Sequence, residues 1–252
     1  MYEGFRPGDN LFGTSVVALD LRTGGRRWHF QTVRHDVWDR DNPHPPILLD
    51  LQVDGTAVPA AVQVTKQGLV FAFHRETGEP LWPIEDVPVP ASQVPGERLS
   101  PTQPVPSRPA PFEIQGLSEE EVVDFTPELR AEALERLGDI RMGPLFNPPI
   151  HRGNPYGYRA AAICPGFTGG ANIIGGAAAD PEMGILYGEG RSGLPRFHAV
   201  DKATGERVGT VDLPAPTTTA PMTFLHEGRQ YIVTAVGAPG RFPGSLVALR
   251  LP

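Results

Sequence analysis

The sequence has almost no cysteine, no long apolar stretch and no excess of basic residues. The single cysteine, Cys164, excludes an intrachain disulfide and a metal site built from several cysteines, and it is interpreted as a small buried or surface thiol. No run of 18 apolar residues is present, so no segment of this chain is expected to span a membrane. With 22 basic and 29 acidic residues, the net charge is −7. This balance argues against a nucleic-acid-binding protein, which normally carries a basic surface.

Glycine and proline are abundant instead. Each occurs 29 times, so together they make 58 of 252 residues, about twice the usual share. That composition disfavours a helical bundle and favours many short strands joined by turns, while 40% hydrophobic residues are enough for a core. The first ten residues lack the pattern of a signal peptide and resemble a loop. We therefore expect the chain to be the C-terminal piece of a longer protein.

A repeated block is the strongest internal signal. Three segments align: ALDLRTGGRRWHF (18–30), AFHRETGEPLWPI (72–84) and AVDKATGERVGTV (199–211). Each contains an apolar strand, a Thr-Gly turn and a second strand, and glycine supplies the positive φ that a tight hairpin needs. Trp28 and Trp82 close the first two units, where we expect them to pack between neighbouring sheets. Strand repeats of this kind predict the blades of a β-propeller.

A long insertion, roughly residues 85–160, interrupts the repeats. Its first half is proline-rich and predicts an extended arm lying on other parts of the protein. Its second half predicts one short helix, with a capping box at Ser118 and Glu121, an N-cap at Thr126 and a stop at Gly138. We expect a surface helix packed on a sheet edge. The predicted fold is all-β: an incomplete β-propeller of about three to four four-stranded blades in a single domain, 1–252, with a proline-rich arm and one short helical insertion.

Three places carry side chains that suit chemistry. The segment from Arg34 to Asn42 is densely polar; it favours either a solvated loop or a site, although its aspartates lack the spacing of an EF-hand. Lys66 precedes an apolar strand, where a lysine is usually a turn residue. The glycine-rich stretch 165–176 lacks the signature of a phosphate-binding loop and favours close approach of backbone to a flat ligand or a neighbouring blade. Asn172 is its only amide side chain.

These segments together resemble one known family. The matching residues lie in NLFGTSVVALDLRTGGRRWHFQTVRHDVWDRDNP, VTKQGLVFAFHRETGEP, VPGERLSPTQP, LSEEEVVDFTPELRAEA, GPLFNPP, PGFTGGANIIGGAAADPEMGILY and PMTFLHEGRQYIVTAVGAPG. The chain resembles the C-terminal part of dehydrogenases that depend on pyrroloquinoline quinone (PQQ), especially the quinoprotein glucose dehydrogenase type. The resemblance covers nearly the whole chain from about Gly8.

The resemblance implies an eight-bladed propeller with PQQ and Ca²⁺ at its axis. It implies that Asp36 is the general base and a Ca²⁺ ligand, that Lys66 contacts the quinone oxygens, and that Asn172 hydrogen-bonds the cofactor. The implied reaction oxidises the CH–OH group of a sugar or alcohol by hydride transfer to PQQ. The implied electron acceptor is a quinone or a cytochrome, and the implied compartment is the periplasm.

The chain also departs from the family pattern. Ile173 stands where the family usually has tryptophan, and Gly237-Ala238-Pro239-Gly240 lacks the family's histidine. The stretch from Tyr187 to Asp201 is shorter than expected, and the family's upstream calcium ligands lie in blades outside this chain. Two hypotheses follow: a dehydrogenase fragment that needs further blades, supplied by a longer chain or by a partner chain that completes the ring, or a non-catalytic propeller that binds partner proteins.

Overall fold

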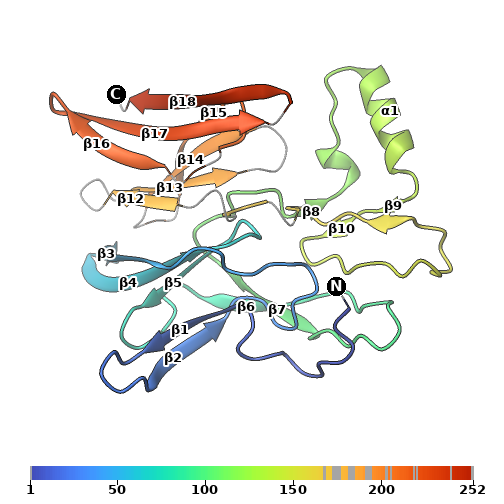
Figure 1. Ribbon diagram of the computed structural model, residues 1–252, viewed down its shortest axis with the longest axis horizontal. Helices are drawn as coiled ribbons and strands as arrows, with labels where there is room; N and C mark the ends of the chain where they lie inside the picture. The colour runs from blue at the N-terminus through green and yellow to red at the C-terminus, as the bar shows by residue number, and fades with distance from the viewer. Residues whose placement is uncertain are drawn as a thin grey trace.

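Short antiparallel sheets make up most of the structure, a computed structural model. It describes residues 2–166, 169–171, 177–180, 185–190, 195–201, 204, 206–217, 219, 221–238 and 240–250. The sheets lie one above another, with the N-terminal half at the bottom of Figure 1 and the C-terminal half at the top. Among the described residues, no helix is long and apolar enough to cross a membrane.

The N-terminal half contains the first two repeat units. Two sheets follow one another here, and their strands are β1 (Ser15–Leu19) with β2 (Arg26–Gln31), and β3 (Ile47–Val53) with β4 (Thr56–Val64) and β5 (Val70–His74). Beyond β5, the Leu81 amide donates to the Ala72 carbonyl and Phe73 forms a β-bridge with Pro80, so the second unit adds a short fourth edge to this sheet. The predicted Thr-Gly hairpins are therefore present in both units.

The C-terminal half contains two larger sheets. The first has four strands and includes the third repeat unit; the second ends the chain. Their strands are β12 (Ala177–Asp180), β13 (Ile185–Gly190), β14 (Arg196–Asp201) and β15 (Arg207–Asp212), then β16 (Met222–His226), β17 (Arg229–Ala238) and β18 (Phe242–Arg250). Among the described residues, β12–β15 is the sheet that shows four full strands. The part of the chain that the structure describes thus contains four blade-like sheets, in agreement with the predicted partial propeller.

The insertion forms a ribbon and a projecting helix. Its remaining elements are β6 (Ile84–Pro88), β7 (Thr102–Pro106), β8 (Gly116–Leu117), the 3-10 helix η1 (Glu119–Glu121), α1 (Pro127–Leu137), β9 (Ile140–Arg141), β10 (Gly143–Pro144) and β11 (Ala160–Ala161). The proline-rich arm pairs with itself as the two-stranded ribbon β6–β7, which tolerates proline because it lies outside any larger sheet.

The predicted helix is confirmed with its caps. The Thr126 side chain accepts a hydrogen bond from the Leu129 amide, and the Ser118–Glu121 capping box is present at η1. The expected packing on a sheet edge is not seen, because α1 buries none of its residues. It stands apart from the large sheets at the right of Figure 1, so its caps and polar surface, rather than a packed apolar face, support it.

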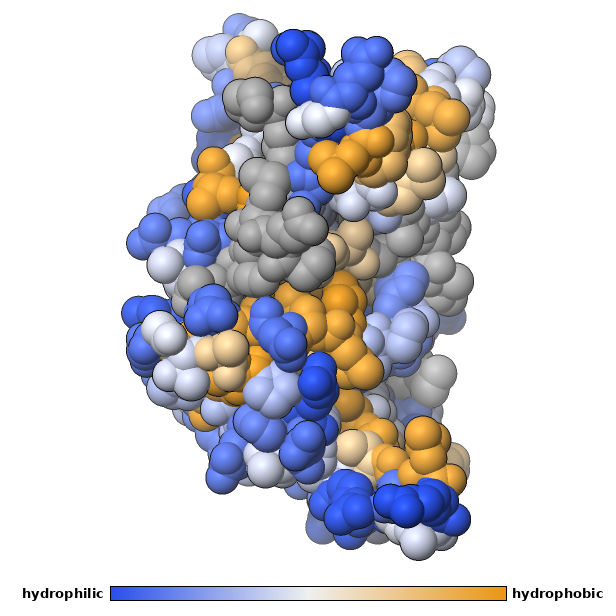
Figure 2. Space-filling model, turned by 90° about the vertical axis from the view of Figure 1, so that its left-hand side faces the viewer, coloured by the Kyte–Doolittle hydropathy of each residue, from blue (hydrophilic) through white to orange (hydrophobic). Residues whose placement is uncertain are grey.

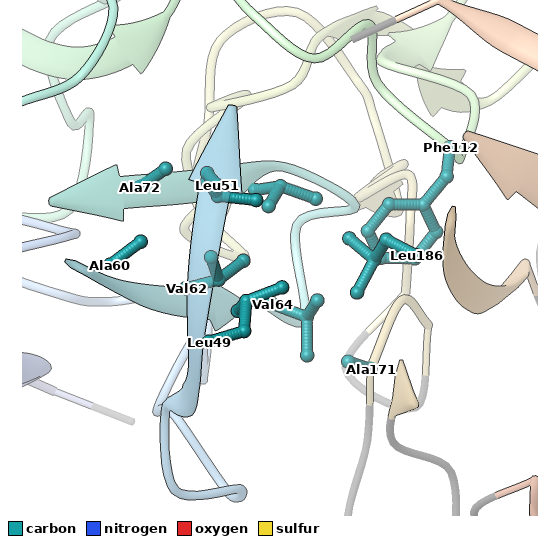
Figure 3. Close-up of a cluster of buried hydrophobic side chains, with 10 residues drawn as sticks. Leu49, Leu51, Ala60, Val62, Val64, Ala72, Phe112, Ala171 and Leu186 are labelled. Carbon is teal, nitrogen blue, oxygen red and sulfur yellow. The ribbon is translucent and has the colours of Figure 1, made fainter. Parts of the chain in front are cut away.

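Three apolar clusters lie between successive sheets. The first joins β3–β5 to Leu186 of β13 and to Phe112 and Ala171. Figure 3 shows its side chains pointing toward one another from these separate segments. A second cluster lies under β5 and includes Trp38, while a third lies between β12–β15 and β16–β18. Face-to-face packing of this kind is what a propeller needs, since each blade buries apolar side chains against the next.

Candidate functional site

The polar loop that follows β2 is folded around the carboxylate of Asp36. Its Oδ1 accepts a hydrogen bond from the Trp38 amide at 2.9 Å, and its Oδ2 accepts one from the Arg40 amide at 2.6 Å. The Thr14 hydroxyl donates to Oδ2 at 3.3 Å. His35 and Asp39 have positive φ values of 45° and 62°, so the chain turns sharply on both sides of this carboxylate. The loop therefore fixes the direction of Asp36 through backbone groups.

Burial sets the protonation behaviour of Asp36. Loss of solvent raises the pKa of its carboxyl above the usual value of 3.8. The amide hydrogen bonds from Trp38 and Arg40, the positive charge of Arg40 and the hydroxyl of Thr14 each oppose that rise without cancelling it. The carboxylate is thus oriented by the loop and is a stronger base than a solvated aspartate.

A cavity of about 640 Å³ opens beside this carboxylate. Three segments far apart in the sequence form its walls: the N-terminal loop, the polar loop and the stretch before the glycine-rich segment. The lining residues are Arg6, Asp9, Asn10, Gly13, Thr14, Gln31, Val33, Asp36, Val37, Trp38, Asp39, Ala161, Ile163 and Gly166. The volume falls in the range of ordinary ligand pockets, and the cavity places Asp36 where a small molecule can reach it.

Lys66 lies in the turn between β4 and β5, as the simplest interpretation of the sequence suggested, but it is not a solvated turn residue. Its side chain is only 3% exposed, and its ammonium pairs with Asp39 Oδ2 at 3.1 Å and with Asp41 Oδ1. The turn between β4 and β5 and the polar loop therefore meet through a cation and two carboxylates. Lys66 therefore contacts the loop that holds Asp36 through Asp39 and Asp41, and not through Asp36 itself.

Arg40 is a central residue that sequence reasoning missed. It is fully buried, and its guanidinium donates to three backbone carbonyl oxygens, those of Lys66, Pro165 and Gly166. Burial lowers the pKa of Arg40 to about 10, so the group stays charged at neutral pH. One side chain thus ties the Asp36 loop to the Lys66 turn and to the start of the glycine-rich stretch. An arginine inside a charged run carries no sequence signal that separates it from a surface residue.

Asn172 lies outside the described residues, so its predicted role stays a prediction. The residues just before it are described and pack on the Lys66 turn. The Ala171 amide donates to the Thr65 carbonyl at 3.1 Å, and Gly170 has a φ of 56°. A Cβ atom at Gly170 would collide with the carbonyl oxygens of Thr65 and Lys66. Glycine is required there because two backbones approach closely.

The described side chains do not form a complete Ca²⁺ site by themselves. Ca²⁺ takes six to eight oxygen ligands, usually including several carboxylates. Among the described residues, no group of three or more aspartate, glutamate, histidine or cysteine side chains is placed to hold a metal ion. Both oxygens of Asp36 already accept hydrogen bonds from the protein. A Ca²⁺ site that included Asp36 would need further ligands beyond the described side chains.

Comparison with known protein families shows which family this chain belongs to. The family model described as "PQQ: Glucose/ethanol/alcohol dehydrogenase, beta-propeller domain" matches residues 1–194 and 190–232. The chain belongs to this family. The resemblance seen in the sequence is therefore confirmed, and with it the partial β-propeller.

Curated relatives in this family act on several hydroxyl compounds by name. The chain is 35% identical over 182 residues to the glycerol dehydrogenase large subunit of Gluconobacter oxydans, covering 71% of this chain and 24% of the relative. It is 30% identical over 253 residues to the quinate/shikimate dehydrogenase (quinone) of Acinetobacter baylyi, covering 96% and 30%. Over 95 residues it is 46% identical to the quinoprotein glucose dehydrogenase of Gluconobacter oxydans, covering 37% and 12%. The chain thus spans less than a third of the length of each of these relatives.

Solved structures match this chain with low similarity. The quinohemoprotein alcohol dehydrogenase ADHIIG of Pseudomonas putida HK5 matches with a TM-score of 0.41 and 20% identity, covering 91% of this chain and 40% of that one. A europium-containing methanol dehydrogenase matches with a TM-score of 0.39 and 19% identity, covering 92% of this chain and 46% of that one. At the level of the family, the predicted cofactor PQQ is confirmed, and the predicted Ca²⁺ stays a prediction.

Proposed function

We propose that this chain forms the Asp36-bearing part of a PQQ-dependent dehydrogenase that oxidises the CH–OH group of a sugar, polyol or simple alcohol. The observation that carries the proposal is the placement of Asp36. Its carboxylate lies on the wall of a cavity of about 640 Å³, is oriented by two backbone amides, and has a raised pKa. A general base needs this combination of reach, fixed direction and raised basicity.

In the proposed reaction Asp36 accepts the hydroxyl proton of the substrate. As that proton leaves, the carbinol carbon loses a hydride and becomes a carbonyl carbon. PQQ, when bound, supplies the two-electron acceptor for the hydride. The amides of Trp38 and Arg40 hold the carboxylate in place before and after it takes the proton, so little reorganisation is needed during the step.

Two further residues are proposed to serve the cofactor. Lys66 is a buried cation that pairs with Asp39 and Asp41 of the Asp36 loop, and a positive charge suits the oxygens of a quinone that gains electrons. Asn172 follows Gly170 and Ala171, which pack on the Lys66 turn, so it is proposed to donate a hydrogen bond to the same ligand. Asp36 is also proposed as one Ca²⁺ ligand, with the other ligands supplied by residues beyond the described part of this chain.

A complete ring is proposed to require more sheets than this chain provides. Several apolar side chains of β16–β18 and its neighbourhood are exposed, among them Met222, Phe224 and Leu246. Figure 2 shows apolar surface at the height of β16 and again in the middle of the face, at the height of β3 and β4 in Figure 1. Since apolar sheet faces are stable when covered, further blades of a longer chain or of a partner chain are proposed to cover them.

The surroundings of the enzyme follow from the same proposal. The family names include sugar, polyol and alcohol dehydrogenases, so the proposed substrate is a small hydroxyl compound. The proposed electron acceptor is a membrane quinone or a cytochrome, and the proposed compartment is the periplasm.

The test compares two carboxylates in a protein that has the remaining blades. The chain is fused to the N-terminal part of the Gluconobacter oxydans glucose dehydrogenase, loaded with PQQ and Ca²⁺, and assayed by dye reduction with glucose, glycerol and ethanol. Asp36→Asn is expected to lower kcat by at least about 100-fold. Quinone binding, followed by absorbance, is expected to change by no more than about threefold, because a hydrogen-bonding amide remains.

Asp54→Asn is the matched control. Asp54 lies in the exposed β3–β4 hairpin with a φ of 49°, which asparagine also tolerates, so full activity is expected. Unchanged turnover in Asp36→Asn would remove Asp36 from the role of base. If the fusion neither binds PQQ nor reduces dye, the alternative of a non-catalytic propeller that binds protein partners is favoured instead.

A further inference from the structure

A buried amide side chain of the proline-rich arm binds the backbone of the Asp36 loop. Gln103 lies in β7 and is completely buried. Its Oε1 accepts a hydrogen bond from the Arg34 amide at 2.8 Å, and its Nε2 donates to the Arg34 carbonyl at 2.7 Å. A single side chain therefore binds both backbone polar groups of one residue, as a neighbouring β-strand residue would.

The side chain of Arg34 strengthens this attachment. Its Nη1 donates to the Thr102 hydroxyl at 2.9 Å and lies 2.8 Å from Asp86 Oδ1. Thr102 and Asp86 belong to the two strands of the β6–β7 ribbon. Arg34 is thus held by the arm at its backbone and at its guanidinium.

Arg34 is also the last residue before the turn that aims Asp36. His35 adopts a positive φ of 45°, and its amide and ring bind the N-terminal loop at the carbonyls of Asp9 and Gly8. Fixing the amide and the carbonyl of Arg34 restrains the peptide planes on both sides of it. Because the backbone has only two soft dihedrals per residue, this restraint fixes the position and direction of the chain as it approaches Asp36.

We propose that Gln103 is a positioning residue for Asp36. It binds the backbone of Arg34 where β2, which ends at Gln31, no longer has a strand partner. In this way it couples the position of the proline-rich arm to the position of the Asp36 carboxylate. The proposal rests on the proposed function only for its effect on turnover. Its structural part, the coupling of the arm to the Asp36 turn, is measurable in this chain alone.

The first experiment follows amide hydrogen exchange in the chain by NMR. In Gln103→Met, exchange at the Arg34 amide is expected to speed up at least tenfold, and the Trp38 and Arg40 amides that bind Asp36 are expected to follow. Gln103→Glu keeps an acceptor for the Arg34 amide but loses the donor to its carbonyl, so a smaller change is expected. If Trp38 and Arg40 exchange at the wild-type rate in both variants, Gln103 does not position Asp36.

Gln63→Met is the matched control for loss of a buried glutamine. Gln63 is 2% exposed, and its amide donates to the carbonyls of His44 and Val64 rather than to the Asp36 turn. It is expected to lower the midpoint of unfolding as Gln103→Met does, while exchange at Trp38 and Arg40 stays unchanged. Equal acceleration in both variants would mean that general loosening, not positioning, explains the effect.

The second experiment uses the active fusion. Gln103→Met is expected to lower kcat about tenfold with KM within a factor of two, and Gln103→Glu to recover part of that loss. An unchanged kcat together with accelerated exchange would overturn the catalytic part of the proposal. A fusion that is inactive with wild-type Gln103 counts against the proposed function, whereas the exchange experiment on the chain still decides the coupling.

Discussion

The first and third repeat units share a sequence pattern but use its last position differently. In the first unit Trp28 packs on the turn of the second: a Cβ at Gly78 would lie 2.6 Å from the indole, and the indole N–H donates to the Arg75 carbonyl at 2.9 Å. In the third unit Gly209 takes this place, and a Cβ there would meet only Ala199, at 3.9 Å. The tryptophan of the first unit is thus an inter-blade contact, and Gly209 offers no such side chain at the same position of the third unit.

The second unit repeats the arrangement of the first. Trp82 packs against the cluster between β3–β5 and β12–β15, and it lines an apolar crevice together with Val200 and Asp201, where the turn of the third unit begins. Each tryptophan therefore points forward along the chain to the next unit. In each of the first two units, one indole packs against the unit that follows and so sets the spacing between these neighbouring blades.

The largest expected effect comes from removing the first of these indoles. Trp28→Ala should lower the free energy of unfolding by about 3 kcal/mol, because apolar contact with Phe73 and the turn of the second unit is lost together with a hydrogen bond. Val208→Ala, at a 58% exposed position of the third unit, should change it by less than about 0.5 kcal/mol. Urea denaturation of both variants measures the contrast. Equal losses would show that the tryptophan has no special role.

A smaller effect is expected at the glycine that receives the indole. Gly78→Ala should cost about 2 to 3 kcal/mol, since the added methyl group meets the Trp28 ring and φ is 78°. Gly24→Ala has nearly the same backbone strain, with a φ of 69°, but open space around the new atom. It should cost about 1 kcal/mol. Thermal unfolding of the pair isolates the contribution of the inter-blade contact, which would be absent if the two variants unfolded at the same temperature.

The smallest expected effect concerns pH and is confined to the C-terminal half. Burial in β14, and then the charges of Arg207 and Arg196, lower the pKa of His198 to about 4 from 6.5. The unfolded chain therefore binds a proton that the folded chain refuses, and stability is lost as pH falls from 6.5 toward 4. Between pH 6.5 and 5 the loss should be about 1.5 kcal/mol.

His198→Gln should remove this acid sensitivity, because glutamine can still bond to Thr210 but does not titrate. Denaturation midpoints measured from pH 7.5 to pH 5 test it, with His226→Gln at an exposed histidine as the control. An unchanged pH profile in His198→Gln would assign the acid sensitivity to other groups.

Local signals predicted the repeats, the turns and the helix caps correctly. The Thr-Gly hairpins, the Thr126 cap and the end of α1 depend on residues a few positions apart, and such short-range interactions can be predicted from a sequence. The site was predictable only in part. Family resemblance predicted Asp36 and Lys66 as site residues. The structure adds that Asp36 is buried and accepts hydrogen bonds from backbone amides, and that two aspartates pair with Lys66.

The connections around the site were not predictable in the same way. Arg40 binds carbonyls 125 and 126 residues away, and Gln103 binds a peptide group 69 residues away. Backbone carbonyls have no residue identity, so no motif records such a partner. Nor did the helical pattern reveal that α1 buries none of its side chains, because spacing predicts a helix without saying what lies beside it.

The forward-pointing tryptophans have a consequence for biosynthesis. Trp28 cannot be seated until the turn at Gly78, 50 residues later in the chain, has left the ribosome. At ordinary translation rates that interval lasts about 3 to 10 s, during which the first hairpin carries an uncovered aromatic ring. The first blade therefore stays uncovered until the next one has been synthesised, and a holdase chaperone can bind the exposed ring during that interval.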